Sequence, residues 1–127
     1  MTDIQPELWV SDVRGAISFY ERAFGATVEH EVFNPADGDT VAQLSIGGAR
    51  FWLASTSEDL RRLSPGEVGG ATARFLLVVE DPAAVAEAAT AAGANQTSPV
   101  GEEHGWLLGR IVDPFGHEWE IGRPPDR

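Results

Sequence analysis

The sequence predicts an α+β fold made of two βαβββ modules in tandem. Each half of the chain reads as a short strand, an amphipathic helix and three further strands, in that order. Matching residues recur at nearly the same spacing. Gly25 and Gly93 lie 68 positions apart, as do Gly48 and Gly116, and Asp12 and Asp81 lie 69 apart because one residue of slack falls inside the helix. Hydrophobic residues make up 43% of the 127 residues, which is enough to fill a core. We therefore expect an internal duplication within a single domain.

The first module is expected over residues 1–56. Asp12 is a suitable N-cap for its helix, and Gly25 is suited to end that helix in a left-handed conformation. The apolar stripe at helical spacing between them consists of Val13, Ile17, Tyr20 and Phe24. Three strand-like segments, ATVEHEVF, TVAQLSI and RFWLAS, follow and are separated by the turns NPADGD and GG.

The second module is expected over residues 71–124, after a polar connector at 57–70 that is rich in Gly and Pro. Asp81 is expected to cap its helix, with Pro82 at the first helical position and Gly93 after the end. A short strand is expected near QTSPV, and two more at WLLGRIV and HEWEIG, on either side of the turn DPFG. The turn residues are expected to have only a structural role.

Composition and charge exclude several kinds of protein. Nine basic against twenty acidic residues give a net charge of −11, which disfavours contacts with nucleic-acid phosphates. Without cysteine the chain has no disulfide, no thiolate nucleophile and no cysteine-ligated zinc. No apolar run reaches the roughly 18 residues that span a bilayer, and the first residues lack the features of a signal peptide. We therefore expect a cytoplasmic protein that binds neither nucleic acid nor membranes.

The segments VSDVRGAISFYERAFGA and GWLLGRIVDPFGHEWEIG, together with the repeated turns, resemble the vicinal oxygen chelate superfamily. That superfamily includes glyoxalase I, extradiol dioxygenases and bleomycin-resistance proteins. The resemblance covers nearly the whole chain. It implies that each module curls its sheet into a half-barrel, that the modules enclose a cleft, and that the protein is a homodimer. Because one fold hosts several chemistries, the reaction has to be inferred from the site.

Metal-dependent members of the superfamily place one ligand on the first strand and one on the last strand of each module. The internal repeat puts these positions at Gln5, Trp52, Arg74 and Glu120. Only Glu120 and Gln5 are of a ligand type, because an indole does not ligate and a guanidinium is a permanent cation without an acceptor. A catalytic metal centre needs about three protein ligands. We therefore expect no metal and no other cofactor.

Glu118 and Glu120 lie two residues apart in the last strand, so their side chains are expected on one face. We interpret Arg74 and Glu120 as an ion pair that replaces the metal. The alternative is an exposed Arg74 and a hydrated Glu120. Glu118 is interpreted as a polar surface residue, and the three histidines, His30, His104 and His117, as structural or solvated.

Four tryptophans in so short a chain point to a binding surface. Trp52 occupies the position equivalent to Glu120, so it is expected to face the cleft. Trp106 is expected to line the cleft as well. Trp9 and Trp119 are expected to pack in the core.

The leading hypothesis is a metal-independent, non-enzymatic protein that sequesters a hydrophobic or aromatic compound, for example an antibiotic. It rests on the resemblance to the drug-binding, bleomycin-resistance branch and on the missing metal ligands. The predicted ligand-binding residues are Trp52 and Trp106 by stacking, and Arg74, Glu120 and Gln5 as polar anchors.

Two alternatives stay open. One is a divalent-metal lyase, isomerase or dioxygenase of the glyoxalase type, with a histidine supplied by an exchanged partner chain. It predicts a bound metal and activity that chelation abolishes. The other is a dimeric scaffold without a ligand, for which the cleft would be collapsed.

Overall fold

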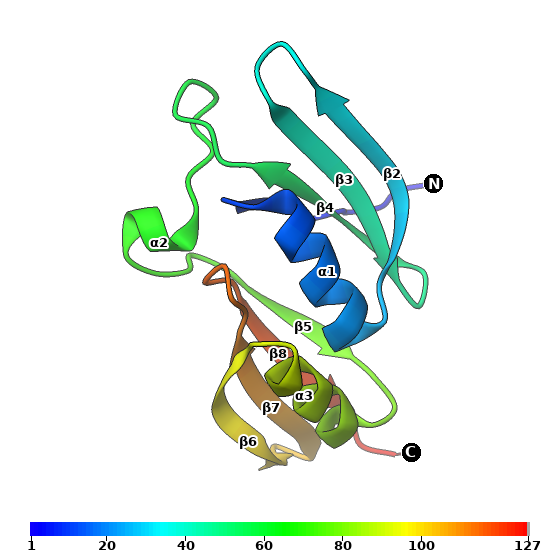
Figure 1. The fold of residues 1–127 in the computed structure, drawn as a ribbon. Coiled ribbons are helices and arrows are strands. Elements are labelled where there is room, and N and C mark those ends of the chain that lie inside the picture. Colours follow the sequence, from blue (N-terminus) through cyan, green and yellow to red (C-terminus); the bar gives the residue numbers. More distant parts are fainter. Residues whose placement is uncertain (127) are drawn as a thin grey trace.

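The computed structural model describes residues 1–126, which form two four-stranded mixed sheets and three helices (Figure 1). Sheet 1 has the strand order β1 (Glu7–Val10), β4 (Ala49–Ser55), β3 (Asp39–Ile46) and β2 (Thr27–Asn34). Sheet 2 has the equivalent order β5 (Arg74–Val78), β8 (Glu118–Arg123), β7 (Trp106–Val112) and β6 (Asn95–Glu103). The helices are α1 (Val13–Phe24), α2 (Pro65–Val68) and α3 (Pro82–Ala91). The predicted α+β class and the tandem βαβββ plan are therefore confirmed.

The strand registers repeat between the two sheets. In each module the first strand pairs in parallel with the last strand, and the remaining neighbours are antiparallel. Trp52 lies opposite Glu7 in sheet 1, and Glu120 lies opposite Leu76 in sheet 2. The two sheets are open and do not close on each other. The two modules are therefore equivalent in their strands as well as in their turns, and this includes the strands that were expected to carry the site.

Both predicted helix caps are present. The Asp12 side chain accepts a hydrogen bond from the Gly15 backbone N–H at 3.0 Å, and the Asp81 side chain accepts one from Ala84 at 3.1 Å. Gly25 ends α1 with a φ of 68°, a left-handed value that glycine adopts without steric cost. In the second module the helix ends at Ala91, with Ala92 as its cap.

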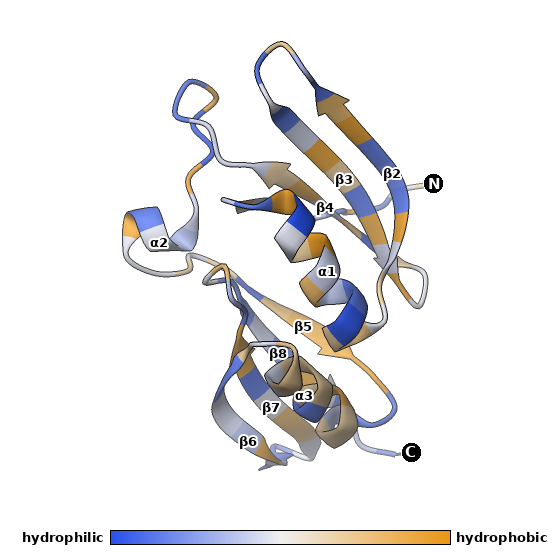
Figure 2. Ribbon diagram, in the orientation of Figure 1, coloured by the Kyte–Doolittle hydropathy of each residue, from blue (hydrophilic) through white to orange (hydrophobic). Residues whose placement is uncertain are grey.

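The core is one cluster of buried side chains that runs through both modules. The helices α1 and α3 pack against each other (Figure 1). The ring of Tyr20 in α1 lies 5.6 Å from that of Trp119 in β8 and 5.3 Å from that of Phe51 in β4. Figure 2 shows β5 as an almost continuous hydrophobic strand. Because aromatic side chains from both modules interlock, the modules share one hydrophobic core.

The DPFG turn has a larger role than its turn chemistry predicted. Asp113 is buried, and its carboxylate accepts hydrogen bonds from the backbone N–H groups of Phe115 at 2.9 Å and His117 at 3.0 Å. It also accepts bonds from the Tyr20 hydroxyl and, at 3.0 Å, from the Trp119 indole. Burial, together with the neighbouring Asp113 charge, raises the pKa of Tyr20 well above its ordinary value. This carboxylate therefore ties α1 of the first module to β8 of the second.

Two further elements differ from the sequence prediction. The strand expected near QTSPV is β6, which is longer and covers Asn95–Glu103. The connector contains a short helix, α2, whose start is stabilised by a capping box between Ser64 and Glu67. No helix among residues 1–126 is long and apolar enough to cross a membrane.

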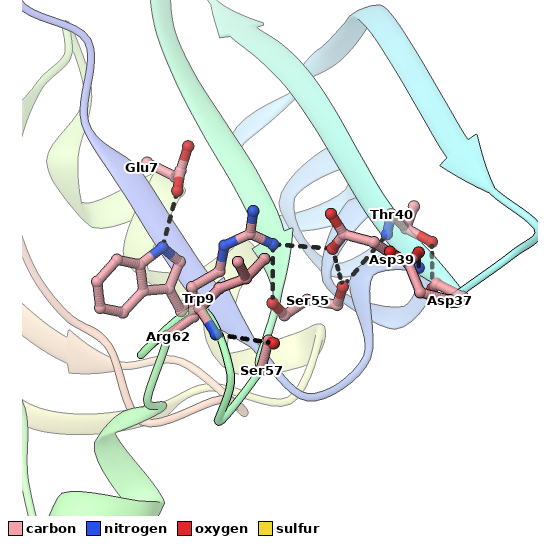
Figure 3. A network of polar contacts seen from close by, with 10 residues as sticks. Glu7, Trp9, Asp37, Asp39, Thr40, Ser55, Ser57 and Arg62 are labelled. Atoms are coloured by element: carbon pink, nitrogen blue, oxygen red, sulfur yellow. Dashed lines mark hydrogen bonds and ion pairs between the residues drawn. The ribbon is translucent and has the colours of Figure 1, made fainter.

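The connector is fastened to sheet 1 by a polar network (Figure 3). The Arg62 guanidinium donates to the Asp39 carboxylate at 2.8 Å, and the Ser55 hydroxyl donates to the same oxygen at 2.8 Å. Backbone hydrogen bonds also pair Ser57 with Arg62. The first part of the connector is therefore held against the start of β3.

Candidate functional site

The candidate site lies on the face of each sheet that points away from the helix, called here the open face. Side chains alternate along a strand, and Phe51 and Leu53 are buried in the core, so Trp52 points to the open face. The same alternation between Trp119 and Ile121 puts Glu120 on the open face of sheet 2. The registers place equivalent residues in two cross-strand rows: Glu7, Trp52, Gln43 and His30 in sheet 1, and Leu76, Glu120, Arg110 and Ser98 in sheet 2.

In sheet 1, Gln5 is the centre of a hydrogen-bonded group. Its side-chain oxygen accepts from the Trp52 indole N–H at 2.8 Å and from the Gln43 amide at 2.8 Å. Its own amide donates to Asp3 at 2.9 Å. Both acceptor positions of the Gln5 side-chain oxygen are therefore occupied. The hydrogen bond from its N–H fixes the orientation of the Trp52 ring, and the two faces of the ring make no hydrogen bond.

In sheet 2, four side chains form an alternating chain of charges. Arg110 donates two hydrogen bonds to the Glu103 carboxylate, at 2.9 and 3.0 Å, and a third to Glu120 at 3.1 Å. Arg74 lies 3.5 Å from the same Glu120 oxygen. The Arg110 hydrogen bonds hold the pKa of Glu103 below its ordinary value, and the same contacts raise the pKa of Arg110. The predicted Arg74–Glu120 ion pair is therefore present, with Arg110 as a second and closer partner.

These residues do not fit a divalent cation. Glu120 is the one acidic residue at the four equivalent positions, and two guanidinium groups already approach its carboxylate. A metal ion there would lie beside two permanent positive charges. Within residues 1–126 no three His, Cys, Asp or Glu side chains are grouped so that they could hold a metal. The Glu120 carboxylate is therefore held in ion pairs and is not an open metal ligand.

The four tryptophans divide between the core and the open faces. Trp119 is 4% exposed and packs in the core, as predicted. Trp9 was also predicted in the core, but it is half-buried, and its indole donates to Glu7 at 2.8 Å. It lies opposite Ala54 in the parallel pair, on the open face with Trp52. Trp106 is half-buried at the start of β7, opposite Glu103.

The structure brings the predicted site residues together in two groups. Gln5 and Trp52 are in direct contact in sheet 1, and Arg74 and Glu120 are in direct contact in sheet 2. Within residues 1–126 no hydrogen bond or ion pair joins one group to the other. The two groups therefore lie on separate open sheets of one chain, whereas the resemblance implied that the modules enclose a cleft.

Sequence reasoning missed Gln43, Arg110 and Glu103, the residues that complete both groups. A signal was available for two of them. Gln43 and Arg110 lie 67 residues apart, one fewer than the 68 that relate Trp52 to Glu120, and the registers make them equivalent neighbours of those two residues. Glu103 could not be found in this way, because its contact with Arg110 spans the irregular register of β6.

Comparison with known proteins agrees with the fold. The sequence profile of the Glyoxalase/Bleomycin resistance protein/Dioxygenase superfamily matches residues 4–121. The chain belongs to this superfamily. An uncharacterized protein of Mycobacterium bovis, Mb0911c, is 33% identical over 95% of this chain and 82% of its own length.

Two solved structures show the same fold. An Arabidopsis thaliana gene product, At5g48480, superposes with a TM-score of 0.74 at 26% identity, over 97% of this chain and 99% of its own. The fosfomycin resistance protein FosX from Listeria monocytogenes superposes with a TM-score of 0.72 over 96% of this chain and 90% of its own. FosX is only 14% identical, so its likeness concerns the fold alone.

Proposed function

We propose that the protein is a metal-independent binding protein that sequesters a small hydrophobic or aromatic compound, for example an antibiotic. One observation carries the proposal. The position equivalent to a metal ligand in sheet 1 holds a tryptophan fixed by Gln5, and the one in sheet 2 holds a carboxylate neutralised by Arg74 and Arg110. These groups suit stacking and hydrogen bonding to an organic molecule.

Trp52 is the proposed stacking platform. Its N–H is bonded to Gln5, so the ring loses little freedom when a planar ligand covers it. Trp106 is proposed as a second aromatic contact, at the start of β7 in sheet 2. The polar anchors are the Arg74–Glu120 pair, which offers one donor and one acceptor group, and the amide of Gln5.

A homodimer is the proposed assembly. Each chain presents one aromatic half-site and one charged half-site on separate open faces. A second copy is proposed to bring the sheet 2 half-site of one chain opposite the sheet 1 half-site of the other. The cytoplasm is the proposed location. The fosfomycin resistance function named for FosX supports a role in resistance only by analogy of fold.

The test is a screen of planar natural products by quenching of tryptophan fluorescence, followed by titrations with the best binder. Trp52→Ala is expected to weaken binding severalfold or more, because it removes the platform and leaves Gln5 exposed. Trp9→Phe is the matched control, since Trp9 shares the open face but is not bonded to Gln5. Equal affinity of the wild type and Trp52→Ala would overturn the assignment of Trp52.

A further inference from the structure

A cavity at the seam between the two modules adjoins the charged half-site, with which it shares Arg74 and Leu76. It has a volume of about 420 Å³ and lies between residues 3–6, the start of β4 and the strand β5. Its walls include Arg74, but neither Trp52 nor Glu120. On its β5 side the wall is an edge strand, because β5 pairs only with β8. A volume of this size lies in the range of small-molecule pockets.

The floor of the seam cavity is aromatic and its rim is aliphatic. Phe51 from the first module and Phe75 from the second both line it, and their rings lie 5.8 and 5.3 Å from the ring of Trp119. At the rim, Ile4 is 87% exposed and Leu76 is 44% exposed. Exposed aliphatic side chains beside an aromatic floor favour an apolar occupant.

The polar part of the wall is positively charged. Arg50 and Arg74 both line the cavity, and Asp3 is its one acidic lining residue. Asp3 is already engaged by the Gln5 amide and by the Ile4 backbone N–H, each at 2.9 Å. Arg50 makes no ion pair with any of residues 1–126, although the chain has a net charge of −11. An unpaired guanidinium in so acidic a protein leaves a donor for an anion.

We propose that the seam cavity binds a small amphipathic anion, whose carboxylate or sulfonate meets Arg50 and Arg74 and whose apolar body lies on Phe51 and Phe75. The positive wall and the apolar floor select this class. An uncharged aromatic molecule would make no charge-assisted hydrogen bond with Arg50, and a hydrophilic anion would leave the aromatic floor uncovered. The site shares Arg74 with the charged half-site of the proposed function, whereas Arg50, Phe51 and Phe75 line the cavity and take no part in that half-site.

Two fluorescent probes that differ in one charged group test the proposal. They are 8-anilinonaphthalene-1-sulfonate and its uncharged relative N-phenyl-1-naphthylamine. The sulfonate is expected to bind at one Arg50-dependent site per chain. Arg50→Gln is expected to weaken its binding by about fivefold or more, because a charge-assisted hydrogen bond is lost, and to leave the uncharged probe nearly unaffected. Arg22→Gln is the matched control, because it changes the net charge equally on the outer surface of α1.

A second variant tests the location without removing a charge. Ala49 is exposed and lines the cavity, so Ala49→Trp is expected to fill the space and to block both probes without disturbing the core. Trp52 does not line the cavity, so Trp52→Ala should leave unchanged the part of the sulfonate binding that depends on Arg50. Failure of the open-face proposal and failure of this one are therefore distinguishable. Equal binding of the sulfonate by the wild type, Arg50→Gln and Ala49→Trp would overturn the proposal. A change of oligomeric state in both variants would do so too, since it would identify the cavity as a contact between two copies.

Discussion

The buried carboxylate of Asp113 offers the sharpest test of how the two modules are joined. Asp113→Asn keeps the shape of the side chain but removes its charge and turns one acceptor oxygen into a donor. If the amide oxygen keeps the backbone bonds to Phe115 and His117, the new NH₂ group faces the Tyr20 hydroxyl and the Trp119 indole N–H. The tyrosine hydroxyl can rotate and accept, whereas the indole can only donate. One buried donor then has no acceptor.

The expected cost follows from these contacts. Losing the one charge-assisted hydrogen bond from the Trp119 indole costs about 1.5–3 kcal/mol, and leaving this buried donor unsatisfied costs about 1–3 kcal/mol. We expect Asp113→Asn to lower the free energy of unfolding by about 3–4 kcal/mol. That is a large part of the roughly 5–15 kcal/mol that stabilises a typical domain. For a chain of this size, the corresponding fall in melting temperature is about 10–15 °C.

Urea denaturation monitored by circular dichroism measures this loss directly. Asp12→Asn is the matched control, because asparagine caps a helix about as well as aspartate and Asp12 is exposed. We expect the control to stay within about 0.5 kcal/mol of the wild type. If Asp113→Asn unfolds at the same urea concentration as the control, the carboxylate does not stabilise the junction between the modules, and the reasoning is wrong.

Three further predictions concern other residues. Tyr20 is the only tyrosine, and its pKa is raised in the folded protein. The stability that this raised pKa contributes is therefore full below pH 10.0 and is lost as the pH rises above that value. Tyr20→Phe should accordingly flatten the decline of the melting temperature at alkaline pH. Arg110→Gln should raise the pKa of Glu103 back toward 4.5, and a ¹³C NMR titration of the carboxyl carbons measures this change. The same pKa of Glu103 in the variant and in the wild type would contradict the hydrogen bonds between Arg110 and Glu103. Gly109→Ala should destabilise the protein by about 1–3 kcal/mol in urea denaturation, because its new Cβ would lie 2.6 Å from a Val100 methyl carbon; unchanged stability would show that β6 yields without cost.

Much of the fold could be predicted because its signals are local. Capping residues and the periodicity of apolar side chains are read from neighbouring positions, and the caps at Asp12 and Asp81 are where the sequence indicated. The repeat then located equivalent strand positions across the modules. The length of β6 was underestimated because Pro99 and Gly101 have a low preference for strands. Pairing with β7 nevertheless holds this segment in a strand.

The site was less predictable, because its contacts depend on register and on how the modules pack. The repeat was sufficient to place Arg74 beside Glu120. It did not reveal that Arg110 approaches Glu120 more closely, since that contact comes from the neighbouring strand. The role of Asp113 was hidden for a different reason: its partner Tyr20 lies 93 residues away, in the other module. Long-range polar contacts of this kind leave no periodic signal.

The claim that ion pairs and a tryptophan replace the metal centre is tested most directly by metal content. Protein purified without chelator is incubated with Ni²⁺, Zn²⁺, Mn²⁺ and Fe²⁺, desalted, and measured by mass spectrometry of the elements, with Glu120→Gln as the control. We expect the wild type to retain no more metal than this variant, because Arg74 and Arg110 already neutralise the Glu120 carboxylate. One metal ion per site in the wild type that Glu120→Gln loses would contradict the account and point to the metal-dependent chemistry of the superfamily.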